Sequence, residues 1–182
     1  MLKGKNVNLR LTKESDLEKI NELMSDLMNR GDYYPMGLHT LVAAKKGFNE
    51  NGFWGEDMGW LVITDKNDEM LGNIGFFKYA PYADGYELGA IIFNPEDRAK
   101  GYMTEALKIF IAYMFEIKKI ERLQAALTEG NKGSEGVFRK CGLTKEGVMR
   151  KAIYHRGQHK NLVLYSILRN ESKSLKETIE SL

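Results

Sequence analysis

The sequence is poor in the residues that build disulfides and metal centres. Its 182 residues include one cysteine and three histidines. A single cysteine excludes an intrachain disulfide, and so few thiol and imidazole groups argue against a zinc site, so we expect no metal. The sequence also lacks an apolar run of the roughly 20 residues that a helix needs to cross a bilayer. Its first five residues lack the apolar core of a signal peptide, which favours a cytoplasmic protein without a membrane partner.

An excess of one charge is also missing. Lys and Arg total 27 and Asp and Glu total 25, which gives a net charge of +2. Proteins that bind the nucleic-acid backbone usually carry a strong excess of positive charge, so we expect no nucleic-acid partner. The hydrophobic content of 43% suffices for a sizeable core, and the length predicts one domain. We assign residues 1–170 to this domain and residues 171–182 to a polar C-terminal tail that frays.

Hydrophobic periodicity predicts a mixed α/β chain. Residues 6–11 alternate as in a half-buried strand, and residues 17–28 have the apolar spacing of a helix. From Met103 to Ile117 the apolar residues form the core-facing stripe of a long helix. The other predicted elements are a helix at 40–48, strands at 60–64, 70–79, 87–93 and 120–127, a short helix from 131 to 142, and a final hairpin of 143–154 and 161–168.

Residues 48–60 combine acidic and aromatic side chains and contain no basic residue. Such a surface suits a cationic amine, through ion pairing and cation–π contact. The alternative is a solvated loop whose aromatic residues fill the core below it. This alternative is favoured, because aromatic side chains usually serve burial. The residues concerned are Phe48, Glu50, Phe53, Trp54, Glu56, Asp57 and Trp60.

Residues 98–104, Arg-Ala-Lys-Gly-Tyr-Met-Thr, have the features of an anion-binding loop. They follow an apolar strand and open the long helix, whose N-terminus presents unpaired N–H groups and a partial positive charge. Gly101 lets a ligand approach the backbone, and Arg98 and Lys100 add two charges. These features predict a phosphate or pyrophosphate ligand, whereas the alternative is an ordinary polar loop that binds nothing. The stretch is neither a P-loop nor a dinucleotide fingerprint, because the Gly-Lys-Ser/Thr and the further glycines of those motifs are absent.

The motif Arg98-x-x-Gly101-x-Met103 resembles the Gln/Arg-x-x-Gly-x-Gly/Ala signature of the GCN5-related N-acetyltransferases (GNAT family), whose loop wraps the pyrophosphate of acetyl-coenzyme A. Met103 stands where a small residue is usual. The order and spacing of five segments resemble the RimJ/RimL-type branch, the ribosomal-protein N-acetyltransferases. These segments are 101–107, 131–134, 141–143, 145–150 and 164–168.

The resemblance implies the family's fold, a single-domain, mostly antiparallel mixed sheet flanked by helices, in which a central strand pair splays apart to admit acetyl-coenzyme A. It implies an enzyme that transfers the acetyl group to a primary amine, such as a protein N-terminus or a polyamine. The alternative is a catalytically silent acetyl-coenzyme A sensor. The oligomeric state is open, and a homodimer is compatible with the sequence. The predicted cofactor contacts are Ile91, Ile92, Phe93, Arg98, Ala99, Lys100, Gly101, Tyr102, Met103, Thr104, Asn131, Phe138, Arg139 and Lys140.

Glu87 is the first candidate for the general base, because an amine must lose a proton before it can attack a thioester. It opens the strand that leads to residues 98–104, and the family places an acid there in Tyr-Glu-Leu-Gly-type sequences. Strand alternation puts it on the same face as Gly89, Ile91 and Phe93. Glu129 is the reserve candidate, and the alternative for Glu87 is an edge carboxylate without a catalytic role.

The leaving thiolate needs a proton or a hydrogen-bond donor. Many relatives use a tyrosine seven residues after the asparagine that corresponds to Asn131, but Phe138 stands here and has no proton to donate. The branch instead carries a serine three residues after the asparagine, and Ser134 matches it; the alternative role of Ser134 is to satisfy backbone groups in the first turn of the helix. Asn131 is expected to cap that helix, and Cys141 is expected in the core. Asn161 stands where the branch usually carries an aspartate.

Overall fold

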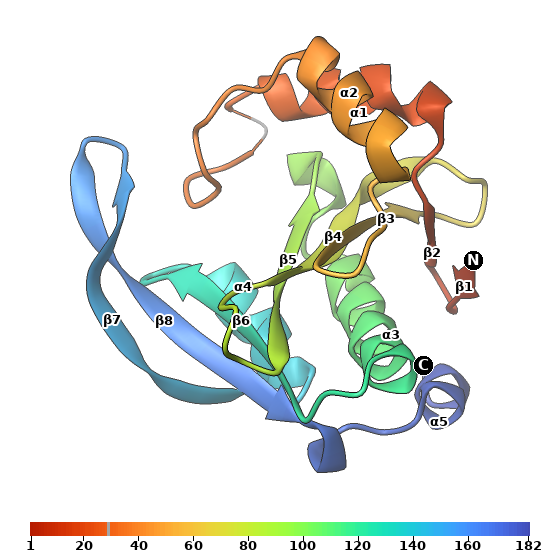
Figure 1. Cartoon of the computed structure of the whole chain (residues 1–182), viewed down its shortest axis with the longest axis vertical. Helices are drawn as coiled ribbons and strands as arrows, with labels where there is room; N and C mark the ends of the chain where they lie inside the picture. Colours follow the sequence, from red (N-terminus) through yellow and green to blue (C-terminus); the bar gives the residue numbers. More distant parts are fainter. Residues whose placement is uncertain (29) are drawn as a thin grey trace.

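The computed structural model describes residues 1–28 and 30–182, which form one eight-stranded sheet with helices beside it (Figure 1). The strands lie in the order β1-β2-β3-β4-β5-β6-β8-β7. They span Leu2–Lys3 (β1), Asn8–Leu11 (β2), Met58–Thr64 (β3), Met70–Lys78 (β4), Gly85–Ile92 (β5), Arg122–Thr128 (β6), Thr144–His155 (β7) and Gln158–Leu168 (β8). The α-helices are Leu17–Ser25 (α1), Leu41–Asn51 (α2), Tyr102–Ile117 (α3), Lys132–Lys140 (α4) and Leu175–Glu180 (α5). Within the described residues no helix has the length and apolar character to cross a membrane.

The observed element order confirms the predicted mixed α/β class. Neighbouring strands are antiparallel except β5 and β6, which are parallel, so the sheet is mostly antiparallel as expected. Element boundaries differ by a few residues from the prediction. Helix α1 ends at Ser25 instead of continuing to residue 28, and α2 continues to Asn51, where Gly52 at φ 63° terminates it.

Strands β5 and β6 pair over three residues and then diverge. Residues 85–87 of β5 pair with residues 122–124 of β6. Beyond Glu87, β5 continues beside β4 alone, and beyond Gln124, β6 continues beside β8 alone, among the described residues. Figure 1 shows the two strands running apart toward their C-terminal ends. This confirms the splayed central pair that the family resemblance implies.

Helix α3 packs its apolar stripe on one face of the sheet. Ala106, Phe110 and Met114 are fully buried, and the ring of Phe110 stacks on Phe76 of β4 with their centroids 6.5 Å apart. The predicted stripe is buried from Ala106 to Met114, whereas Met103 is half-buried and Ile117 is 44% exposed. Because residues 98–101 lead directly into α3, this packing fixes the loop relative to the end of β5.

The C-terminal segment is packed against α3, which differs from the expected fraying tail. Ser174 caps α5 by accepting a hydrogen bond from Glu177 N, and the Glu177 carboxylate accepts one from Ser174 N. Thr178 is buried, and Leu175 packs against the core. A six-residue helix is unstable alone, so its stability comes from tertiary contacts that periodicity cannot reveal.

Candidate functional site

Glu87 lies at the point where β5 and β6 separate. It is in register with Gln124, and Gln124 Nε2 donates a hydrogen bond to Glu87 Oε2 at 2.9 Å. Strand alternation puts Glu87, Gly89 and Ile91 on the sheet face opposite to α3. Glu87 is half-buried and therefore combines a fixed orientation with access to a ligand between the strands. A carboxylate held in this way can accept a proton.

Backbone N–H groups of β5 also face the space between the diverging strands. The Phe93 N–H bonds to the Leu71 carbonyl on the β4 side, at 2.9 Å. Because N–H groups of successive residues point to opposite sides of a strand, those of Leu88 and Ala90 point toward β6. In a parallel ladder the N–H of Leu88 completes the last β5–β6 pair, Glu87 with Gln124, whereas the N–H of Ala90 lies beyond that pair and is available to a ligand. A donor of this kind can stabilise a developing oxyanion.

The indole ring of Trp60 lies over Gly75 and Gly89, on the sheet face that carries Glu87. A Cβ atom at Gly75 would come within 2.6 Å of Trp60 Cδ2, and one at Gly89 within 2.9 Å of Trp60 Cη2. The two glycines therefore leave the space that the ring occupies. Gly89 is two residues from Glu87 on the same face, so an aromatic surface adjoins the carboxylate. The sequence analysis missed Trp60 as a site residue, because only the register of β3, β4 and β5 brings it next to Glu87.

The rest of the acidic and aromatic 48–60 segment packs elsewhere. The Trp54 ring meets Phe76 edge-on, 5.4 Å between centroids, on the face that α3 covers. Glu56 pairs with Lys118 at 2.7 Å, and this contact holds the pKa of the Glu56 carboxyl below its usual value. Trp54 thus packs against the core, although its side chain is only half-buried.

Gly101 forms the N-cap of α3 in a left-handed conformation, with φ 89°. No side chain caps the helix, and its first intrahelical bond runs from Glu105 N to Gly101 O at 3.1 Å. A Cβ atom placed on Gly101 would meet nothing within 4 Å, so the space in front of the backbone is open. The first-turn N–H groups, the dipole and this open space together suit an anion.

The two basic residues of the loop are both engaged. Arg98 donates to the carbonyl oxygens of Ile92, at 3.1 Å from Nη2, and of Phe93, at 3.0 Å. Burial lowers the pKa of the Arg98 guanidinium. Lys100 pairs with Asp97 at 3.1 Å. Arg98 therefore fastens the loop to the end of β5, a positioning role that the sequence analysis did not foresee.

Asn131 caps α4, as predicted, because its Oδ1 accepts a hydrogen bond from Ser134 N at 3.1 Å. Ser134 lies in the first turn of α4. The Phe138 ring packs edge-on against Tyr165, 5.4 Å between centroids, so it serves the core. Arg139 and Lys140 are exposed in the last turn, and their contact with a cofactor stays a prediction, as do the roles of Ser134 and Glu87.

Glu129 lies away from Glu87. It follows the end of β6, five residues beyond Gln124, or about 16 Å along the strand at roughly 3.3 Å per residue. Asn161 Nδ2 donates to Glu129 Oε2 at 2.9 Å, and Glu129 N donates to Asn161 O at 3.0 Å. The structure thus separates the two candidate bases: Glu87 lies where the strands part and Glu129 at the far end of β6.

The segment of residues 30–40, which leads to α2, contacts the tip of the β7–β8 hairpin and the start of α4 (Figure 1). The carbonyl of Asp32 is 2.6 Å from His155 Nε2, and its carboxylate is 3.4 Å from Arg156. The Tyr33 hydroxyl donates to the Gly130 carbonyl at 3.0 Å. Residues 32 and 33 therefore connect the tip of the β7–β8 hairpin to the segment between β6 and α4.

Cys141 is a core residue, as expected, and we predict that it is chemically inert. Its Sγ donates to the Thr104 carbonyl at 3.4 Å, and burial raises the pKa of the thiol to about 12. At pH 8 roughly one molecule in 10,000 then carries the reactive thiolate. We expect iodoacetamide to label native Cys141 on the order of 1,000-fold more slowly than an exposed cysteine, measured by mass spectrometry. Rapid labelling of folded protein would contradict this placement.

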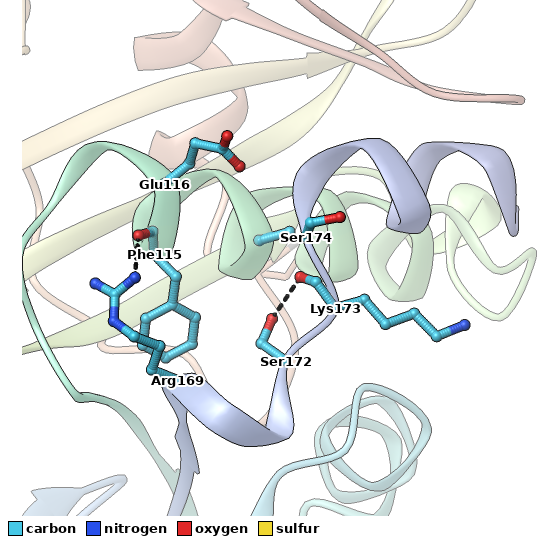
Figure 2. Close-up of a pocket in the computed structure, with 7 residues that line it drawn as sticks. Phe115, Glu116, Arg169, Ser172, Lys173 and Ser174 are labelled. Atoms are coloured by element: carbon cyan, nitrogen blue, oxygen red, sulfur yellow. Dashed lines mark hydrogen bonds between the residues drawn. The ribbon is translucent and has the colours of Figure 1, made fainter.

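A cavity of about 360 Å³ lies on the other side of α3, next to α5 (Figure 2). Arg169 borders it and donates to the carbonyl oxygens of Phe115, Ile120 and Lys118, so its guanidinium is bound to the end of α3.

Among the described residues, His, Cys, Asp and Glu side chains form no group that could hold a metal ion.

Comparison with known proteins agrees with this arrangement. Residues 6–144 match the family model of the acetyltransferase (GNAT) domain. The chain is 31% identical over 156 residues to the uncharacterized N-acetyltransferase YnaD of Bacillus subtilis; the aligned region covers 86% of this chain and 89% of YnaD.

Two solved structures share the fold. Spermidine N-acetyltransferase from Vibrio cholerae, in complex with CoA and spermine, superposes with a TM-score of 0.80 at 18% identity, covering 91% of this chain and 97% of that one. RimL, the ribosomal L7/L12 α-N-protein acetyltransferase in complex with coenzyme A, superposes with a TM-score of 0.76 at 18% identity, covering 93% and 97%.

Proposed function

This chain belongs to the GNAT acetyltransferase family, and we propose on that basis that it transfers an acetyl group from acetyl-coenzyme A to a primary amine. The observation that supports this most strongly is the separation of β5 and β6, with Glu87 at its base and the uncapped N-terminus of α3 at its open end. An extended thioester substrate and an amine can meet between two such strands.

The residues present fit acetyl-coenzyme A as the co-substrate. The open backbone at Gly101 and the first turn of α3 suit its pyrophosphate, with Ala99 to Thr104 as the contacting segment. The unpaired edge of β5, including Ile91 and Ile92, suits the amide-containing arm. Asn131, Phe138, Arg139 and Lys140 are proposed to bound it from the side of α4.

Glu87 is proposed to remove the proton from the attacking amine, directly or through a water molecule, because it is the carboxylate at the point of divergence. Gln124 holds its orientation by the 2.9 Å hydrogen bond. The N–H group of Ala90 is proposed as a donor to the tetrahedral oxyanion. Ser134 is proposed to hydrogen-bond the departing sulfur, since Phe138 has no proton to donate.

The acceptor is proposed to be a protein N-terminus or a small amine such as a polyamine. The relatives support both classes, since the neighbouring folds include a spermidine and a ribosomal-protein N-acetyltransferase. Trp60 offers an aromatic surface next to Glu87 on which the acceptor can rest. We further propose a cytoplasmic location and no nucleic-acid or membrane partner; a homodimer is compatible with the proposal.

Acetyl-coenzyme A is expected to raise the thermal midpoint of the purified protein. A ligand at about 100 times its dissociation constant adds roughly 2.7 kcal/mol to the free energy of unfolding. For a domain of this size that corresponds to a shift of roughly 5–11 °C, measured by scanning calorimetry. No shift at millimolar cofactor would contradict both the enzyme and the sensor, whereas a shift without turnover on any amine would favour the sensor.

A further inference from the structure

The β7–β8 hairpin carries a one-sided charge that the proposed chemistry does not use. Between Gly147 and Asn161 the chain has four Lys or Arg residues and no Asp or Glu, although the whole protein is nearly neutral. Two of the four cations contact the loop after α1. Arg156 pairs with Asp32 at 3.4 Å, and Lys160 Nζ lies 6.0 Å from the centroid of the Tyr33 ring.

The other two, Arg150 and Lys151, are exposed and line a cavity of about 500 Å³ together with Asn161. In the described part of the chain neither cation makes an ion pair. The carboxylate of Glu129 lies beside this region, because the side chain of Asn161 donates a hydrogen bond to it. Because Arg150 and Lys151 carry two positive charges and Glu129 only one negative charge, the cavity is positively charged.

The backbone holds this cavity open through a bulge. Met149 pairs with Leu162 and Ile153 with Lys160, so three residues of β7 stand opposite Asn161 alone. Lys151 lies in the left-handed region with φ 51°, and Asn161 Oδ1 accepts a hydrogen bond from its N–H at 2.8 Å. A bulge of this kind redirects side chains and is typical of the surroundings of binding sites.

The cavity lies within reach of an acceptor bound at Glu87. Asn161 is hydrogen-bonded to Glu129, which is about 16 Å along β6 from the register position of Glu87, at roughly 3.3 Å per residue. An extended peptide covers that distance in about five residues. Figure 1 shows the hairpin running along the side of the molecule toward which β6 points.

We propose that the hairpin selects a polypeptide acceptor that carries acidic side chains about four to six residues after its N-terminal amine. This rests on the proposed transfer of an acetyl group to an amine. Arg150 and Lys151 attract the acidic side chains and repel a polycation such as spermidine, because like charges brought together in a site are unfavourable. Arg150 and Lys151 are specificity-determining residues and touch neither the amine nor the cofactor.

The test uses two synthetic peptides with a free N-terminus, Ser-Ala-Ala-Asp-Glu-Asp-Ala-Ala and its amide counterpart Ser-Ala-Ala-Asn-Gln-Asn-Ala-Ala, with spermidine as a third acceptor. We expect kcat/KM for the acidic peptide to be about tenfold higher than for the amide peptide. This is the ratio that corresponds to the binding free energy of two exposed ion pairs. The Arg150→Gln/Lys151→Gln double variant should abolish this preference and leave the KM for acetyl-coenzyme A unchanged. Raising the salt concentration should reduce the parent protein's preference for the acidic peptide, since salt screens the interaction between exposed charges.

The matched control is Lys173→Gln/Lys176→Gln, which removes two exposed charges, one just before α5 and one in its first turn, and should leave the preference intact. Asn161→Asp adds a carboxylate beside the two cations and should weaken use of the acidic peptide. Equal use of both peptides by the parent protein, or a change in acetyl-coenzyme A KM alone, would overturn the proposal. Binding of the two peptides, labelled with fluorescein at the C-terminus, to the protein with coenzyme A gives a readout that does not need turnover. If the parent protein binds the acidic and the amide peptide equally well, this inference is refuted. If it binds the acidic peptide selectively but acetylates no amine, the proposed function is refuted.

Discussion

Replacement of Glu87 by glutamine is expected to lower turnover by roughly 100- to 10,000-fold at neutral pH, the range typical of a lost general base. The side chain keeps its shape, and its amide oxygen can still accept the hydrogen bond from Gln124 Nε2. Folding and acetyl-coenzyme A affinity should therefore be unchanged, measured by thermal denaturation and calorimetric titration. What is lost is the ability to take a proton from the amine.

The pH dependence distinguishes a catalytic Glu87 from a structural one. As pH rises, more of the amine is already neutral, so the rate loss in Glu87→Gln should shrink. Glu116→Gln is the matched control, because Glu116 is exposed on α3 beside the cavity of Figure 2. If the Glu87 variant turns over within about threefold of the parent, below the range for general-base catalysis, and Glu129→Gln does not, the base is Glu129.

Gly101→Val is expected to weaken acetyl-coenzyme A binding by about 100-fold or more. The added side chain enters the open space in front of the α3 N-terminus and blocks two or more charge-assisted hydrogen bonds, each contributing about 1.5–3 kcal/mol. Affinity is measured by calorimetric titration with acetyl-coenzyme A and with coenzyme A.

Backbone strain needs its own control, because valine is disfavoured at φ 89° and such a conformation costs about 1–3 kcal/mol. Gly52→Val supplies it. Gly52 ends α2 at φ 63°, and a Cβ atom there also meets nothing within 4 Å. Both variants should lose similar stability, and the Gly101 variant alone should lose affinity. Unchanged binding in Gly101→Val would mean that the phosphate site lies elsewhere.

Local sequence signals predicted much of this protein. The apolar stripe of α3, the cap at Asn131 and the core position of Cys141 depend on residues close together in the chain, and each is found as expected. The separation of β5 and β6 came from the family resemblance, because no periodicity reveals where two parallel strands stop pairing.

Features that depend on the alignment of distant strands could not be predicted from the sequence. Trp60 reaches Gly89, two residues from Glu87, only through the alignment of β3, β4 and β5. Arg98 looked like an anion ligand, but its guanidinium is turned back to the carbonyl oxygens of β5, an outcome set by where the loop is anchored. Packing of α5 on α3 likewise depends on contacts between distant segments.

The most direct test of acetyl transfer follows both products in one reaction. Purified protein is incubated with acetyl-coenzyme A and, in turn, N-terminal peptides, polyamines, amino acids and aminoglycosides; free thiol is titrated while the acetylated amine is quantified by mass spectrometry. We expect at least one acceptor to yield thiol and acetylated amine in equal amounts, and Glu87→Gln to suppress both. Binding of acetyl-coenzyme A without turnover on any acceptor, or thiol release without an acetylated amine, would contradict the assignment as an N-acetyltransferase.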